Sequence, residues 1–133
     1  MTRNEARENM MKILYEMDMS KELNPESATS LVDSRLSGKH KERGRVLIFN
    51  ILDNLDNIDD AINSHSKSWK TTRMPKVDLA IMRLALGEMN FSEDIPHAVA
   101  INEAINLSKK YSTEQSSRFV HGVLGAISNE NEQ

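Results

Sequence analysis

The segment "AINEAINLSKKYSTEQSSRFVHGVLGAI", residues 100–127, carries the pattern of two amphipathic helices separated by a short break. Before Tyr111, apolar residues recur every three or four positions, which is the spacing of one face of an α-helix. Ser112 and Gln115 have the spacing of a capping box, so we expect the second helix to begin there. Its apolar stripe consists of Phe119, Val120, Val123, Leu124 and Ile127.

The same helical period runs through the rest of the chain, without strand-like alternation of useful length. The stripe from Ile48 to Ile62 fits either one helix or two, because "DNLDN" within it is a weak helix former. Further helix starts are predicted at Thr2 with Glu5, which form a capping box, at Asn24-Pro25, and at Pro75 and Pro96.

Six or seven helices with short loops and no repeat period predict an all-α fold, a single globular domain of about seven helices. The polar stretch 64–74 contains the only Trp and divides the chain into two helical groups. We expect one domain over residues 1–127, with subdomains at about 1–66 and 74–127. Residues 128–133 are predicted to form a polar tail.

Composition limits the possible functions of the chain. With 17 basic and 20 acidic residues the net charge is −3, so any nucleic-acid site must be a local basic patch. The 133 residues include no Cys, which excludes disulfides and thiolate chemistry. No signal-peptide h-region and no membrane span is predicted, so we expect a soluble, cytoplasmic protein.

Catalytic signatures are missing from the sequence, and we predict no enzyme activity. There is no GxSxG, no glycine-rich phosphate loop and no HExxH motif. The histidines lack metal-ligand spacing, and Asp56 with Asp59 or Asp60 is better explained as a solvated helix face. We therefore expect neither a cofactor nor a metal.

Two sets of charged residues allow a structural and a functional interpretation. Arg3 and Arg7 lie four apart near a helix N-terminus, where basic residues oppose the macrodipole, although nearby glutamates can pair with them. Asp78, Arg83 and Glu88 are spaced by five, so they cannot share one solvent-exposed stripe. At least one must lie near the apolar face, and we interpret Arg83 and Glu88 as members of structural ion pairs.

The motifs as a set resemble the NusB family of bacterial transcription antitermination factors. The resemblance rests on "R…AR…LYEMD", "W…R…VDLAIMRLALGE", "IP…AINEAI.L.KKY" and "FV.GVL", which together extend from about Arg3 to Ile127. The run from Trp69 to Leu124 is its specific part.

This resemblance implies two three-helix-type bundles and no catalysis. It implies binding of boxA-type single-stranded RNA from ribosomal RNA operons, together with ribosomal protein NusE, in an antitermination complex on RNA polymerase. The family's RNA-binding positions correspond to Arg3, Arg7, Gln115, Arg118 and Phe119, and its NusE-facing acidic position corresponds to Asp78.

The chain departs from the family pattern at Asn4, Thr72, Gly87 and His121, which predicts weaker or differently distributed RNA contacts. From the residues alone, Phe119 can be a core side chain or an RNA-stacking one. Two alternatives to antitermination also remain open: a NusB-like adaptor that binds protein only, and an RNA-binding module in rRNA maturation. The sequence is compatible with a monomer or a homodimer.

Overall fold

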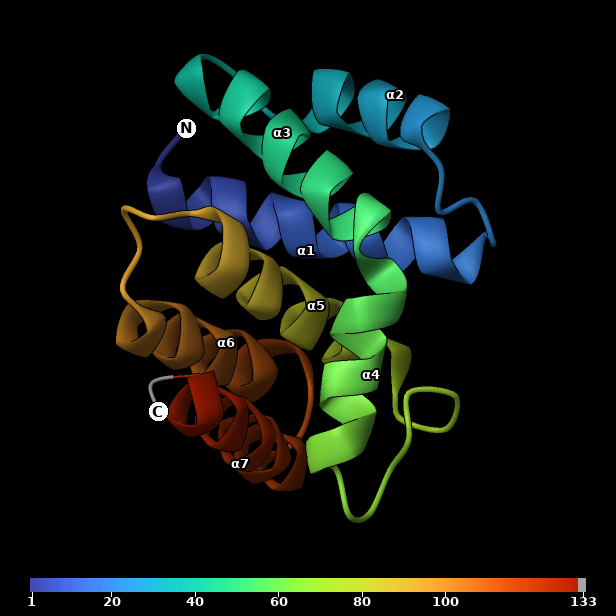
Figure 1. Ribbon diagram of the computed structural model, residues 1–133. Helices are drawn as coiled ribbons and strands as arrows, with labels where there is room; N and C mark the ends of the chain where they lie inside the picture. Colours follow the sequence, from blue (N-terminus) through green and yellow to red (C-terminus); the bar gives the residue numbers. More distant parts are fainter. Residues whose placement is uncertain (132–133) are drawn as a thin grey trace.

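The computed structural model describes residues 1–131 of the chain, and over that range all regular structure is α-helical (Figure 1). The helices are α1 (Arg3–Met19), α2 (Pro25–Arg35), α3 (Lys39–Asp53), α4 (Leu55–His65), α5 (Lys76–Phe91), α6 (His97–Tyr111) and α7 (Glu114–Asn131). The predicted all-α fold of about seven helices is confirmed.

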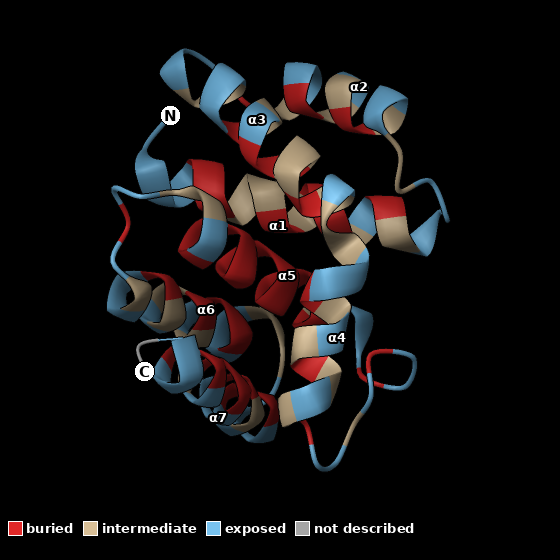
Figure 2. Ribbon diagram, in the orientation of Figure 1, coloured by how far each residue is buried: buried red, intermediate tan, exposed pale blue. Residues whose placement is uncertain are grey.

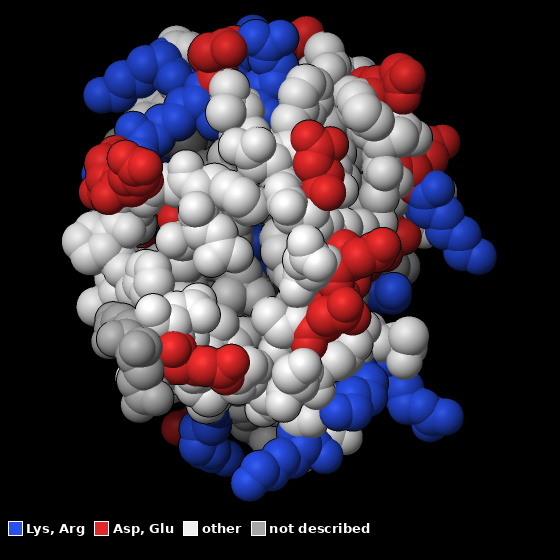
Figure 3. Space-filling model, viewed as in Figure 1, with Lys and Arg blue, Asp and Glu red and all other residues white. Residues whose placement is uncertain are grey.

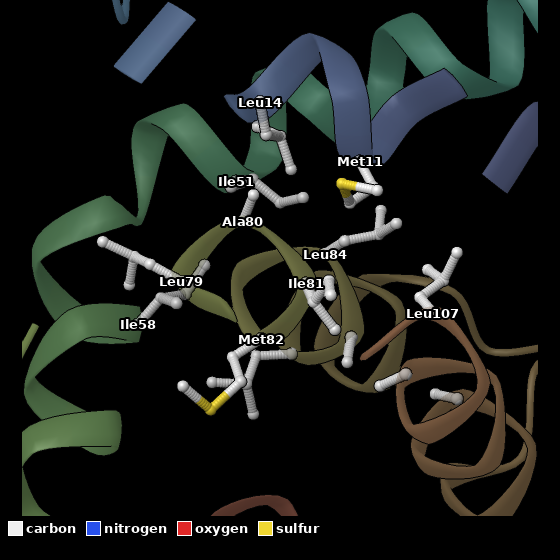
Figure 4. Close-up of a cluster of buried hydrophobic side chains, with 14 of the residues drawn as sticks. Met11, Leu14, Ile51, Ile58, Leu79, Ala80, Ile81, Met82, Leu84 and Leu107 are labelled. Carbon is white, nitrogen blue, oxygen red and sulfur yellow. The ribbon is translucent and has the colours of Figure 1, made fainter. Parts of the chain in front are cut away.

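Helix α5 is the central element. It packs against α1, α3, α4, α6 and α7, and every residue from Asp78 to Met89 is buried (Figure 2). Its apolar side chains point outward in several directions, toward Met11, Ile58 and Leu107 of three other helices (Figure 4). A helix that is apolar on all sides requires such an enclosed position.

The remaining helices pack around α5. Helices α1, α2 and α3 pack against one another, and α6 packs against α7. Helix α4 packs against α5 and α7, although it belongs to the N-terminal group in sequence. One continuous apolar core therefore includes residues of all seven helices and joins the two predicted groups.

Local signals placed most helix ends correctly. The Thr2–Glu5 capping box is present, and Asn24 caps α2 by accepting a hydrogen bond from the Ser27 amide. The apolar stripe from Ile48 to Ile62, which was compatible with one helix or two, belongs to two helices that meet at Asn54. There the Asn54 side-chain amide donates to the Asn50 carbonyl at 2.8 Å and so ends α3.

The start of α7 differs from the prediction by one residue. Thr113, not Ser112, accepts the hydrogen bond from the first turn, through its hydroxyl and the Ser116 amide at 3.0 Å. Ser112 instead ends α6, where its amide donates to the Ser108 carbonyl at 2.8 Å. Two adjacent hydroxyl residues offered two cap positions, and the geometry of the preceding helix end decided between them.

Helix α7 also continues past residue 127, where the sequence predicted a polar tail. Ser128 is buried, and its hydroxyl forms a 3.2 Å hydrogen bond with Nδ1 of His97 on α6. Glu130 contacts the imidazole of His65 on α4. These tertiary contacts fix a segment that has no apolar stripe of its own, and the last two residues of the predicted tail lie outside the described range.

Two of the three charged residues buried in α5, Arg83 and Glu88, each have a partner on another helix, as predicted. Arg83 binds both carboxylate oxygens of Asp59 on α4, at 2.9 and 2.6 Å, and Asp18 on α1 at 3.2 Å. Arg7 on α1 forms a bidentate pair with Glu88, at 2.9 Å for the closest atoms. Arg7 and Glu88 are 4% and 2% exposed, so their charges compensate each other inside the protein.

We predict that Arg7→Met destabilises the fold by about 3–5 kcal/mol, because it leaves the Glu88 carboxylate buried and unpaired. The double variant Arg7→Met/Glu88→Leu is expected to recover most of that loss. Denaturant unfolding followed by circular dichroism measures both values.

The matched control is Arg35→Met, which breaks an Arg–Glu pair of similar geometry between α1 and α2 whose members are 37% and 46% exposed. An exposed pair contributes about 1 kcal/mol or less. Equal losses for Arg7→Met and Arg35→Met would contradict a structural role of the buried pair.

Candidate nucleic-acid interface

The start of α7 presents two of the predicted RNA-binding side chains to solvent. Gln115 and Arg118 are both exposed. The Arg118 side chain is 72% exposed, and Glu114, one turn earlier, approaches its guanidinium only to 4.0 Å. An exposed pair of this length is weak, so the guanidinium is available to a phosphate group.

Phe119 is half-buried, so it is neither a fully enclosed core side chain nor a fully exposed stacking one. Its ring contacts the core on one side and packs edge-on against the Trp69 ring, with centroids 5.3 Å apart and planes at 65°. Val120 behind it is fully buried. Phe119 therefore both covers the core and exposes part of an aromatic ring beside Arg118.

Sequence reasoning did not identify Trp69 as a site residue. It lies in the loop between α4 and α5, where its amide donates to the Ser66 hydroxyl at 3.1 Å. Trp69 is the only Trp of the chain and stands in a polar stretch. No local sequence pattern, however, indicates that it contacts Phe119, which lies far along the chain.

The same loop contributes basic side chains. Lys67 and Arg73 are exposed and make no ion pair within residues 1–131. Lys70, by contrast, donates to the Asn63 and Ser66 carbonyls at 2.8 and 3.0 Å and so caps the end of α4. Figure 3 shows basic side chains gathered at the lower edge of the molecule, beneath α4 and α7. This local patch is compatible with a net charge of −3.

The two N-terminal arginines have different surroundings, although both line one cleft beside α1. Arg3 is exposed and pairs with Asp94 at 3.2 Å. Arg7 is buried against Glu88, and in this conformation its guanidinium cannot reach a nucleic acid at the surface. Burial lowers the pKa of Arg7, but the hydrogen bonds and charge of Glu88 outweigh it and raise that pKa above its ordinary value. The guanidinium stays charged.

A third aromatic residue, Tyr111 at the end of α6, lies close to α1, and sequence reasoning did not single it out as a site residue. The Tyr111 hydroxyl donates to the Glu8 carboxylate, and this hydrogen bond lowers the pKa of Glu8. The amines of Lys12 and Lys110 lie 5.5 and 5.4 Å from the centre of the Tyr111 ring. Both ammonium groups also pair with Glu8, at 3.8 and 3.1 Å, so the half-buried ring is part of a charged and aromatic cluster on this side of the molecule.

Asp78 is enclosed rather than presented to a partner. It is 0% exposed, and neither carboxylate oxygen has a hydrogen-bond partner within the described chain. In this conformation the carboxylate does not reach the surface, and its contact with a protein partner stays a prediction. Helix spacing could not reveal this burial, because α5 is covered on all sides by elements distant in sequence.

Residues 1–131 contain neither a candidate metal site nor a candidate membrane span. No group of three or more His, Cys, Asp or Glu side chains there could hold a metal ion. None of the helices in that range is long and apolar enough to cross a membrane.

Curated relatives match the chain over almost its full length. The transcription antitermination protein NusB of Pelotomaculum thermopropionicum is 42% identical over 129 residues, which cover 96% of this chain and 89% of that protein. The protein of the same name from Bacillus mycoides is 41% identical over 129 residues, covering 96% and 97%.

Solved structures share the fold. T. maritima NusB superposes with a TM-score of 0.88 at 34% identity, covering 98% of this chain and 92% of that one. A complex described as antitermination factors NusB and NusE with dsRNA contains a chain with a TM-score of 0.82 and 27% identity, with 96% of each chain covered.

The model of the NusB family matches residues 4–129, which include Arg7 and the α7 residues of the candidate interface, while Arg3 lies one position before the match. The resemblance inferred from the motifs is therefore confirmed by the family model, by relatives at about 40% identity and by the shared fold. This chain belongs to the NusB family.

Proposed function

We propose that this protein is a non-catalytic, cytoplasmic transcription antitermination factor that binds boxA-type single-stranded RNA of ribosomal RNA operons. It does so with ribosomal protein NusE, within a complex on RNA polymerase. The observation that carries the proposal is the exposed Arg118 beside the half-buried Phe119–Trp69 pair at the start of α7. The relatives' shared name supports the antitermination role, and the solved complex of NusB and NusE with dsRNA supports binding of NusE and of RNA.

The proposed RNA contacts divide into two kinds. An unpaired base stacks on the exposed part of Phe119, while Arg118 and Gln115 bind the adjoining phosphate and sugar. Arg3 binds phosphate at the other end of the interface. Arg7 acts indirectly in this proposal, because its pair with Glu88 holds the first turns of α1 in position.

The direct test is a titration of boxA RNA, with and without NusE, at moderate salt. The small acidic net charge gives poor non-specific attraction, so we expect weak binding alone and tighter binding with NusE. Equal affinity in both conditions would contradict the composite interface. NusE binding without any RNA binding would favour a protein-only adaptor.

Phe119→Ala is predicted to weaken RNA binding by about 1–3 kcal/mol, since it removes the stacking surface. Phe119→Tyr is expected to keep most of the affinity, because the exposed edge tolerates a hydroxyl. RNA should also change the emission of Trp69, the only tryptophan, because its ring contacts Phe119. Fluorescence titration measures both effects.

The control for Phe119→Ala is Phe49→Ala, which truncates another partly buried phenylalanine, on α3. Both variants lose some stability, and only Phe119→Ala is expected to lose affinity. Normal RNA binding by a folded Phe119→Ala protein would show that the ring serves the core alone.

We further propose that NusE engages Asp78 after the side chain rotates outward. A buried carboxylate without a donor is unfavourable, so a donor on the partner would favour that rotation. Asp78→Asn should then leave the melting temperature unchanged or raise it, while NusE binding falls by about 2 kcal/mol or more. Calorimetric titration with NusE measures the loss.

Asp53→Asn, at an exposed position at the end of α3, is the control for the change in net charge. Unfolding by Asp78→Asn, or equal NusE affinity for the two variants, would argue for a structural role of Asp78.

A further inference from the structure

A cleft of about 450 Å³ lies between the start of α1, the start of α3 and the loop that joins α5 to α6. It is distinct from the Phe119 surface at the start of α7. Apolar side chains form part of its wall and basic side chains line the rest. The apolar part consists of Ala6, Met10, Leu47 and Ile95.

Two arginines from different helices meet at one oxygen in this cleft. Arg3 of α1 reaches Oδ2 of Asp94 at 3.2 Å, and Arg43 of α3 contacts the same oxygen. The hydrogen bond from Arg43 lowers the pKa of Asp94, so the carboxylate is ionised. Asp94 thus occupies the position that a phosphate oxygen would take between two guanidinium groups.

The cleft has more positive charge than Asp94 neutralises. Arg7 and Glu88 compensate each other, which leaves Arg3, Lys39 and Arg43 against one carboxylate. This is a net charge of +2, counting three cations less one anion and taking His40 as neutral. The side chain of Lys39 makes no ion pair within the described range, and α3 begins there without a side-chain cap. Both features favour an anion.

The contacts of Asp94 can be exchanged at little cost. The side chains of Asp94, Arg3 and Arg43 are 54%, 55% and 51% exposed. Solvated ion pairs contribute little to stability, so a phosphate can displace the carboxylate without disrupting the core.

We propose that this cleft binds one nucleotide of the RNA, with its phosphate between Arg3 and Arg43 and its base against the apolar wall, and that Asp94 closes the site in the free protein. The inference rests on the proposed RNA-binding function. It adds Arg43 and Lys39 to the interface and assigns Asp94 as a competitor of the RNA phosphate. Figure 3 shows basic side chains gathered near the N-termini of α1 and α3, with acidic side chains beside them.

The central test is Asp94→Asn, which removes the competing charge with little change in shape. RNA affinity, measured with NusE present, is expected to rise about threefold or more, and the salt dependence to steepen by about one unit. Arg43→Gln and, separately, Lys39→Gln should weaken binding and reduce the salt dependence by about one unit each. In Asp94→Asn/Arg43→Gln the gain from Asp94→Asn should be lost.

Glu93→Gln is the matched control, because it makes the same charge change one residue earlier, at an exposed side chain that does not line the cleft. An equal gain from Glu93→Gln and Asp94→Asn would show only a long-range charge effect and overturn the proposal. Melting curves verify that each variant is folded.

These experiments distinguish an error in the assignment of the cleft from an error in the proposed RNA-binding function. RNA binding that responds to Phe119→Ala but not to Asp94→Asn, Arg43→Gln or Lys39→Gln would overturn the cleft alone. Absence of RNA binding by both the unaltered protein and Asp94→Asn would overturn both. Uridine monophosphate is expected to compete only weakly with the RNA. Competition at similar concentrations would assign the cleft to free nucleotides and overturn the RNA assignment.

Discussion

The fold depends on neutralising two of the charged residues that α5 carries into the centre of the molecule, Arg83 and Glu88. Every residue from Asp78 to Met89 is buried, and Arg83 and Glu88 are the charged residues in this run that have ionic partners. Unpaired, either charge would cost several kcal/mol in this environment. Asp59 and Asp18 neutralise Arg83, and Arg7 neutralises Glu88, so the same contacts attach α1 and α4 to α5. These pairs join α5 to α1 at both Glu88 and Arg83, and to α4 at Arg83.

This requirement also determines which residues remain available for RNA. Arg7 cannot both neutralise Glu88 and contact a phosphate at the surface, so the arginines at the start of α1 are divided between the core and the cleft. Outside the cleft, positive charge at the surface comes from exposed groups at the start of α7 and in the loop between α4 and α5, such as Arg118, Lys67 and Arg73. A protein with net charge −3 thereby presents local basic surfaces, and we expect its affinity to depend on a partner that completes them.

The carboxylates of Asp94 and Asp78 differ in whether hydrogen-bond donors contact them. Asp94 at the surface accepts from two arginines, whereas Asp78 inside the protein accepts from none within the described chain. In our proposals each is released from its present position by a partner: RNA phosphate displaces Asp94, and NusE offers a donor to Asp78. The free protein would then hold its interface partly closed, and binding would exchange internal contacts for intermolecular ones.

The sequence alone determined the helices and the family, because helical periodicity, caps and motif spacing are local properties. It also predicted that Arg83 and Glu88 are structural, since spacings of five cannot share one exposed stripe. The tertiary structure decided which residues meet: Trp69 with Phe119, Arg3 and Arg43 with Asp94, and Arg7 with Glu88. It likewise decided that Asp78 is enclosed and that α7 continues to Asn131. Burial and pairing depend on elements far apart in the chain, and no local pattern records which of them come together.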